Sequence, residues 1–161
     1  MNAPGDGFPK GTEEMLPVEQ QELYARGAEA VENGDTRLGL ICLEKLYLAT
    51  PGPLTASYYA VCLAKERRQA DRAMELCAEA MEKDPGNSLH YLNLGRVLLA
   101  TGMKREAIKA FRDGLLYGRD PRISRELELL GWRHLPVIPS MGREHLFNRV
   151  LGKILYKLGL R

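Results

Sequence analysis

The chain has 161 residues, of which 45% are hydrophobic and 27% are charged, and its formal net charge is +2. This composition is typical of one soluble globular domain with a hydrophobic core, and it excludes a wholly disordered or fibrous protein. The charge is uneven, because residues 142–161 hold five Lys/Arg against one Glu and the preceding residues are net negative. A generally basic protein that binds nucleic acid is therefore not expected.

The first 17 residues are rich in proline and glycine and are expected to form a flexible leader. These residues contain no basic region leading into a long apolar run. Nowhere in the chain does a stretch reach about 18 consecutive apolar residues. The sequence therefore predicts neither a secretory signal nor a membrane-spanning helix, which favours a cytoplasmic protein. Three cysteines, Cys42, Cys62 and Cys77, lack CxxC spacing. This pattern argues against disulfides and zinc and favours reduced, partly buried thiols.

Six helices are predicted in the middle of the chain. Their expected ranges are 18–33, 36–49, 54–67, 70–83, 88–101 and 104–117. Helix-ending glycines occur in "ENGD" and "ATGM", and the segments "TPGP" and "DPGN" separate successive pairs of helices. The second pair has "KERRQAD" in place of a glycine turn, so its turn is expected to be longer or differently shaped.

The pattern of small and bulky residues repeats every 34 residues. Small residues recur at one position of the repeat: Gly39, Ala73 and Ala107. Larger residues follow four positions later: Leu43, Cys77 and Phe111. A small residue lets two helices approach closely, while the larger residue fills the adjoining gap. The repeat therefore predicts paired helices that stack on their neighbours.

Residues 20 to about 121 thus resemble three tetratricopeptide (TPR) repeats of a small bacterial type. The resemblance implies an all-α fold, a right-handed α-solenoid of three helix pairs plus capping helices. The repeats are expected at about 20–53, 54–87 and 88–121. A TPR domain over 18–131 would then end in a capping helix at about 121–131, with Asp120 as its N-cap and Pro121 as its first residue. Residues 132–141 form a proline-containing linker.

In TPR proteins the first helix of each repeat lines a concave groove that receives an extended peptide or a helix. The resemblance therefore implies a non-enzymatic protein-interaction scaffold or adaptor. The implied partner-binding residues are Tyr24, Ala28, Val31, Tyr58, Cys62, Lys65, Leu89, Leu92, Arg96 and Leu99. Most are aromatic or aliphatic, so an apolar peptide or helix is the expected partner. An alternative for each residue is packing against the preceding helix.

Two more specific family functions differ in how well they fit. TPR cochaperones hold the carboxylate end of chaperone tails with Lys, Asn and Arg side chains. The corresponding residues here are Tyr24, Ala28, Tyr59, Leu89 and Asn93, of which only Asn93 is similar, so this clamp is not expected. Type III secretion chaperones are similar in length and repeat plan, and a secretion-chaperone-like holder of an apolar effector segment stays an alternative.

The sequence contains no motif that points to catalysis, a cofactor or a metal. GxxxxGK[ST], GxGxxG, HExxH and GxSxG patterns are all absent. The histidines His90, His134 and His145 fall in different predicted elements, without an obvious Cys or acidic partner at ligand spacing. Each is therefore expected at a surface or interface.

The last 20 residues, 142–161, predict a basic amphipathic helix. Its expected apolar face comprises Phe147, Val150, Leu151, Ile154, Leu155 and Leu158. A basic border follows i, i+4, i+8 spacing: Arg149, Lys153 and Lys157. Gly152 and Gly159 lower its helix propensity, so the helix is expected to need a surface. Three surfaces stay open: the solenoid itself, a protein partner or second copy of the chain, and an anionic membrane.

Overall fold

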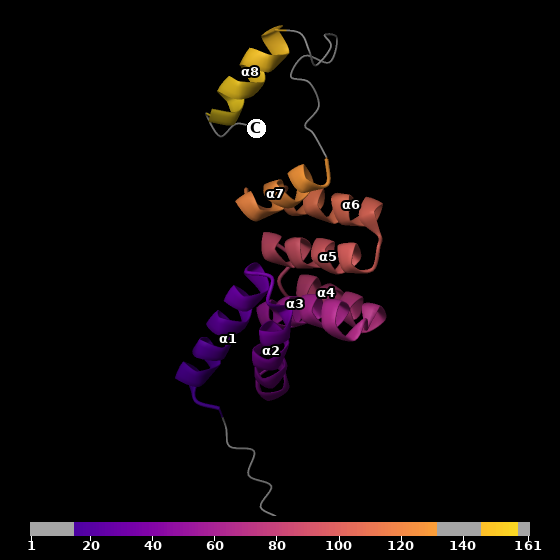
Figure 1. Cartoon of the computed structure of the whole chain (residues 1–161). Coiled ribbons are helices and arrows are strands. Elements are labelled where there is room, and N and C mark those ends of the chain that lie inside the picture. The colour runs from indigo at the N-terminus through magenta and orange to yellow at the C-terminus, as the bar shows by residue number, and fades with distance from the viewer. Residues whose placement is uncertain (1–14, 132–145, 158–161) are drawn as a thin grey trace, which may run out of the picture. The chain divides into compact units, whose positions relative to one another are not determined.

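The structure is a computed structural model that describes residues 15–131 and 146–157 (Figure 1). Every element in these residues is helical, with eight α-helices and one π-helical turn, η1. Their bounds are α1 Pro17–Glu32, α2 Thr36–Ala49, α3 Pro53–Cys62, η1 Leu63–Arg67, α4 Ala70–Lys83, α5 Ser88–Ala100, α6 Lys104–Gly114, α7 Pro121–Leu129 and α8 Leu146–Lys157. The chain divides into two compact units, residues 1–124 and 125–161.

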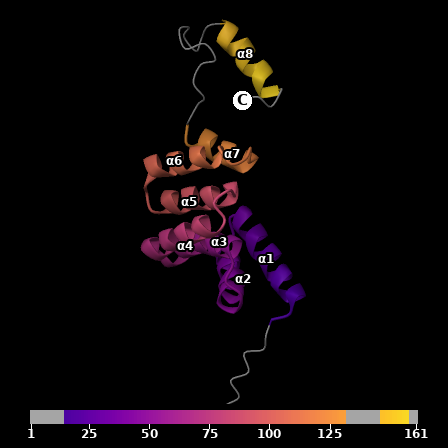
Figure 2. The same cartoon turned by 180° about the vertical axis from the view of Figure 1, so that it is seen from behind.

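Consecutive helices of the first unit pack as pairs. The closest packing joins α1 to α2, α3 to α4, and α5 to α6. Helix α3 also packs against α1 and α5, so the first helices of the pairs form one layer (Figures 1 and 2). This arrangement is an α-solenoid, which confirms the predicted all-α fold class.

Local signals in the sequence fix where several helices begin. Asp35 and Asn87 are the N-caps of α2 and α5, and their side chains accept hydrogen bonds from Leu38 N (3.1 Å) and Leu89 N (3.0 Å). The predicted cap of α7 is confirmed, because Asp120 Oδ1 accepts a hydrogen bond from Arg122 N at 2.9 Å.

Glycines and alanines allow the paired helices to approach closely. A Cβ atom on Gly27 would lie 2.7 Å from Leu43 Cγ, and one on Gly95 would overlap the ring of Phe111. Leu43 and Phe111 are completely buried in the resulting core. The predicted bulky residues Leu43 and Phe111 therefore fill gaps between paired helices, and a Cβ on the predicted small residue Gly39 would lie 2.8 Å from Val31 Cγ2.

The turns within the three helix pairs share one backbone feature but differ in sequence. Gly34 and Gly102 have positive φ angles of 85° and 82°, a conformation that glycine adopts readily. Arg68 stands 34 residues from each of them and also has a positive φ, 53°. A non-glycine residue pays roughly 1–2 kcal/mol for this left-handed conformation. The unusual turn predicted for "KERRQAD" is thus the π-helical turn η1 followed by Arg68.

Two predicted helix ends differ from the structure. The helix expected over 54–67 is α-helical only to Cys62, after which the backbone widens into η1. The helix expected over 104–117 ends at Gly114, because residues 115–117 form a turn with hydrogen bonds from each N–H to the carbonyl three residues before. The leader up to residue 14 and the linker over 132–141 lie outside the described residues.

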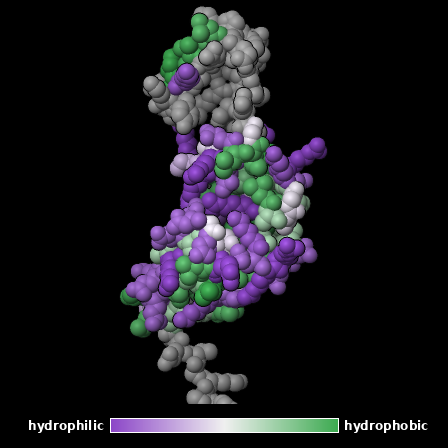
Figure 3. All heavy atoms as spheres, viewed as in Figure 1, coloured by the Kyte–Doolittle hydropathy of each residue, from purple (hydrophilic) through white to green (hydrophobic). Residues whose placement is uncertain are grey.

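Helix α8 covers residues 146–157 of the predicted C-terminal helix. Its side chains Leu146, Val150, Leu151 and Ile154 are exposed, Leu155 is partly exposed, and the basic residue Lys153 is exposed. Hydrophobic residues are accordingly visible on the described part of α8 in Figure 3. The side chains of Phe147, Arg149, Lys157 and Leu158 lie outside the described part of the structure.

Candidate functional site

Four of the residues predicted to line the groove are buried. Val31, Tyr58, Cys62 and Leu92 expose only 5%, 3%, 0% and 0% of their surface. Val31, Tyr58 and Cys62 belong to the hydrophobic core of the first unit. Their side chains pack between helices and are not available to a partner in this conformation. These four residues therefore pack against other helices, as in the alternative interpretation, and do not line an open groove.

The other predicted groove residues remain at least partly accessible. Tyr24, Ala28, Leu89, Arg96 and Leu99 are half-buried, and Lys65 is exposed. They come from α1, α5 and the π-helical turn that continues α3. The layer of first helices thus presents a mixed surface of aromatic, aliphatic and cationic side chains.

A cluster of charged groups joins three helices of this layer to the start of α7. We call it the groove cluster, and its members are Glu32, Tyr58, Arg96, Asp120 and Arg122. Arg96 donates two hydrogen bonds to the Glu32 carboxylate, at 3.1 and 2.9 Å. Tyr58 Oη (3.0 Å) and Arg122 Nη1 (3.0 Å) also donate to Glu32 Oε1. The Arg122 guanidinium contacts both Asp120 oxygens, at 2.9 and 2.6 Å.

The electrostatics of the groove cluster keep its four charged groups ionised at neutral pH. Burial alone would raise the pKa of Glu32, but hydrogen bonds from Arg96 and Tyr58 and the charges of Arg96 and Arg122 hold it below its ordinary value. A hydrogen bond from Arg122 likewise lowers the pKa of Asp120. Two carboxylates and two guanidinium groups balance, so the cluster has no net charge.

Sequence reasoning found Arg96 and Tyr58 but missed the rest of the groove cluster. Glu32 and Arg122 stand 90 positions apart, and no local pattern joins them. One signal was available, because Glu32 lies one position beyond the predicted groove residue Val31, near the end of the same helix. The repeat register assigns only one face of each helix to the groove, and Glu32, the carboxylate at the centre of the cluster, falls outside that face.

A second polar network joins α3 and α5 within the layer of first helices. His90 Nδ1 lies 3.0 Å from Ser57 Oγ, and His90 Nε2 lies 3.2 Å from Asp84 Oδ2. The Asn93 amide donates to Ser57 Oγ at 3.2 Å. His90 is completely buried, so a surface position for it is wrong, and the turn before α5 brings Asp84 to the imidazole as an acidic partner.

The Asp84, His90 and Ser57 contacts have the connectivity of a hydrolase triad but not its accessibility. Ser57 and His90 are both 0% exposed, so no substrate can reach Ser57 Oγ. The single Ser57 hydroxyl proton has two acceptors within reach, the carbonyl of Leu54 at 3.1 Å and His90 Nδ1 at 3.0 Å. These contacts satisfy buried polar groups, as expected for a core network.

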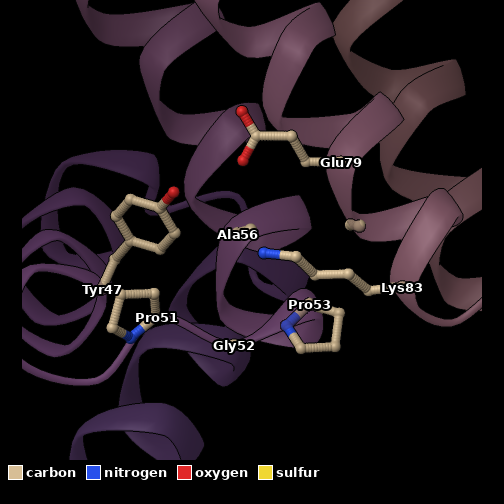
Figure 4. Close-up of a pocket in the computed structure, with 8 residues that line it drawn as sticks. Tyr47, Pro51, Gly52, Pro53, Ala56, Glu79 and Lys83 are labelled. Atoms are coloured by element: carbon tan, nitrogen blue, oxygen red, sulfur yellow. The ribbon is translucent and has the colours of Figure 1, made fainter.

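One space at the surface of the first unit is too small for a small-molecule ligand. The space between Tyr47, Glu79 and Lys83 at the turn over residues 51–53 measures only about 10 Å³, close to the volume needed for one water (Figure 4). Hydrophilic residues cover most of the face seen in Figure 3, and the hydrophobic residues form separate patches.

The described residues contain no group of three or more His, Cys, Asp or Glu side chains arranged to hold a metal ion. All three cysteines are free and buried, where the sequence predicted partly buried thiols. Burial raises the pKa of Cys62 and of Cys77 to about 12, so these thiols stay protonated at neutral pH. None of the helices within 15–131 and 146–157 is long and apolar enough to cross a membrane.

Stacked helix pairs, with accessible side chains along the layer of first helices, define an α-solenoid protein. The tetratricopeptide repeat family model matches residues 64–127. The first TPR domain of human RPAP3 aligns with a TM-score of 0.55 at 19% identity, over 72% of this chain and 92% of that chain. The Sgt2 TPR domain from Aspergillus fumigatus aligns with a TM-score of 0.55 at 21% identity, over 72% of this chain and 78% of that chain.

A third similar structure contains a peptide. It is the second TPR domain of human RPAP3 in complex with the HSP70 peptide SGPTIEEVD, with a TM-score of 0.52 at 18% identity, over 72% of this chain and 98% of that chain. No curated protein sequence matches the chain. Residues 64–127 thus match the tetratricopeptide repeat family, and the chain shares the helical fold of TPR domains.

Proposed function

We propose that the chain is a protein-interaction scaffold that binds an extended peptide or a helix along the layer formed by α1, α3 and α5. The observation that carries this proposal is the set of accessible side chains on that layer, among them Tyr24, Leu89 and Arg96. Aromatic and arginine side chains are over-represented among the residues that contribute most to binding at protein interfaces. The peptide complex of the second TPR domain of human RPAP3 supports the same use of this fold.

The partner segment is expected to be amphipathic, with apolar side chains as its main anchors. Tyr24, Ala28, Leu89 and Leu99 offer apolar contact surface, and the neutral groove cluster offers hydrogen-bonding groups. A C-terminal carboxylate is a poor candidate because Asn93, the one clamp-like residue, is fully buried and donates its amide to Ser57. A secretion-chaperone-like holder of an apolar effector segment is a special case of this proposal.

The scaffold proposal can be tested with peptides selected from a random library against the full chain. Calorimetry then compares the unaltered chain, a Tyr24→Ala, Leu89→Ala variant, and a control variant, Ile41→Ala, Leu48→Ala, whose two side chains are strongly exposed on α2. Loss of two interface anchors is expected to weaken binding at least about tenfold, against about twofold or less for the control. Equal binding by the groove variant and the unaltered chain, with both folded by circular dichroism, would refute the proposal.

A peripheral membrane adaptor is the second candidate function, and α8 favours it. Its apolar residues Leu146, Val150, Leu151 and Ile154 are exposed next to Lys153, the pattern of helices that lie on anionic membranes. The full chain is expected to co-sediment at low salt with vesicles that contain phosphatidylglycerol but not with pure phosphatidylcholine. A Val150→Glu, Ile154→Glu variant should lose this binding. Failure of the full chain to bind, or its dimerisation through α8 instead, would exclude the membrane candidate.

A further inference from the structure

An open cavity of about 590 Å³ lies beside the π-helical turn of the second helix pair. It is formed where η1, the start of α4 and the end of α5 meet. Its lining residues are Ala64, Lys65, Arg68, Ala70, Ala100 and Thr101. Three of these are alanines with short side chains, which leave the space open, and the two large polar side chains are both cations.

The two cations of this cavity have no anionic partner among the described residues. Within residues 15–131 and 146–157, no hydrogen bond or ion pair involves the side chain of Lys65 or Arg68, and no carboxylate of these residues lines the cavity. The acidic residue closest in sequence, Glu66, accepts a hydrogen bond from the Thr36 hydroxyl and does not line the cavity. By contrast, Arg67 is paired with Glu44 through two hydrogen bonds of 2.6 Å. The lining of the cavity therefore carries two cations and no carboxylate.

The backbone at Arg68 supplies an independent observation. The equivalent turns of the other two helix pairs use Gly34 and Gly102, with φ values of 85° and 82°, whereas Arg68 adopts φ 53° with a long side chain. Glycine would form the same turn with less strain, so the turn itself does not require arginine. A strained residue next to a cavity is a reason to look for a function of its side chain.

We propose that this cavity receives an acidic side chain of a protein partner, with Lys65 and Arg68 as its cationic contacts. The inference rests on the proposed scaffold function and adds a chemical requirement to the partner. Lys65 already belongs to the predicted groove set, so a segment bound along the layer of first helices can place an Asp or Glu side chain here. An internal acidic residue suffices, because the site makes no use of a chain terminus.

The test uses a glutamate-rich peptide with an acetylated N-terminus and an amidated C-terminus, titrated into the full chain at low salt. Backbone amide shifts in NMR spectra are expected to be saturable and largest for residues 64–70 and 100–101. Arg68→Gly and Lys65→Ala are each expected to weaken binding roughly twofold to fivefold, the size typical of a solvent-exposed charge pair. Arg37→Ala and Lys45→Ala, which remove the same charges from α2, serve as matched controls and should bind as the unaltered chain does.

Two results would overturn the inference. One is the absence of saturable shifts at residues 64–70, and the other is an equal loss of binding in the α2 controls, which would indicate unspecific attraction to positive charge. Arg68→Gly is expected to keep the fold, since glycine suits this backbone conformation, and its amide spectrum verifies this. Failure of this titration leaves the library experiment on Tyr24 and Leu89 untouched, so the two proposals fail separately.

Discussion

Arg68 is held in a left-handed backbone conformation that glycine adopts more easily. Replacement of Arg68 by Gly is therefore expected to raise the free energy of unfolding, by about 1 kcal/mol. Urea unfolding of both proteins at one pH would measure the difference. Gly102→Ala provides the opposite test, because alanine at φ 82° should lower stability by about the same amount. A destabilised Arg68→Gly variant would mean that the arginine side chain contributes more to folding than its backbone strain costs.

Gly95 shows how strictly one residue can control the approach of two helices. A Cβ atom at this position would overlap the Phe111 ring, and Phe111 is fully buried. Gly95→Ala is therefore expected to destabilise the protein by about 1–3 kcal/mol through overpacking. Gly86→Ala is the matched control, since a Cβ there meets nothing within 4 Å. Thermal unfolding should separate the two variants clearly, and equal melting temperatures would contradict the packing argument.

At the scale of elements, the carboxylate of Glu32 ties the end of α1 to α5 and to the start of α7. Glu32→Gln keeps the shape of the side chain but removes the charge that accepts hydrogen bonds from Arg96, Tyr58 and Arg122. Because this group is only partly exposed, the expected loss of stability is about 1–3 kcal/mol.

The effect of Glu32→Gln should also be local. Amide hydrogen exchange is expected to accelerate in the last turn of α1 more than in its first turn. Glu29 is an exposed residue of the same helix, so Glu29→Gln serves as the control. It should alter the free energy of unfolding by no more than about 0.5 kcal/mol. If both variants behave alike, the groove cluster does not hold these elements together.

The helices of the first unit could be predicted from sequence because two kinds of signal agree. The 34-residue pattern sets which residues pack together, and caps such as Asp35 and Asp120 set where helices begin. The π-helical turn η1 could not be predicted. Residues 63–67 have ordinary helical composition, and the widened hydrogen bonding appears only where the chain must leave α3 without a glycine.

The candidate site was predictable only in part, for a different physical reason. The repeat register assigns residues to one face of each helix, and this found the accessible residues Tyr24, Leu89 and Arg96. It does not show how far neighbouring helices cover that face, so Cys62 and Leu92 were assigned to a surface although both are fully buried. Ion pairs between distant residues, such as Glu32 with Arg122, depend on how the pairs stack and leave no local signal.

At the scale of the whole molecule, stability is expected to depend on pH in two stages. The stage in acid comes from four carboxyl groups whose pKa values are lower in the folded state than in the unfolded chain. They belong to Glu32, Glu44, Asp84 and Asp120. Lowered carboxyl pKa values stabilise the folded chain above the unfolded values, near pH 4, and this stabilisation is lost as the pH falls further. An earlier stage, nearer neutral pH, involves His90.

Burial lowers the pKa of His90 in the folded state and outweighs the raising effect of Asp84. Below the ordinary histidine pKa of about 6.5, the unfolded chain therefore binds a proton that folded His90 does not bind. The free energy of unfolding should then decrease from about pH 7 to about pH 5, by at most ~1.4 kcal/mol per pH unit for this one group. Urea unfolding across this range measures the slope.

The slope can be assigned to His90 by comparison with a His90→Gln variant. Glutamine does not titrate, so the variant should be less stable than the natural chain near neutral pH yet lose less stability on acidification. His134 and His145 are present in both proteins, so their contribution cancels in the difference between the two slopes. Identical slopes would show that His90 takes up its proton equally well in the folded state. In that case the buried contact with Asp84 would be an ion pair rather than a contact of a neutral imidazole.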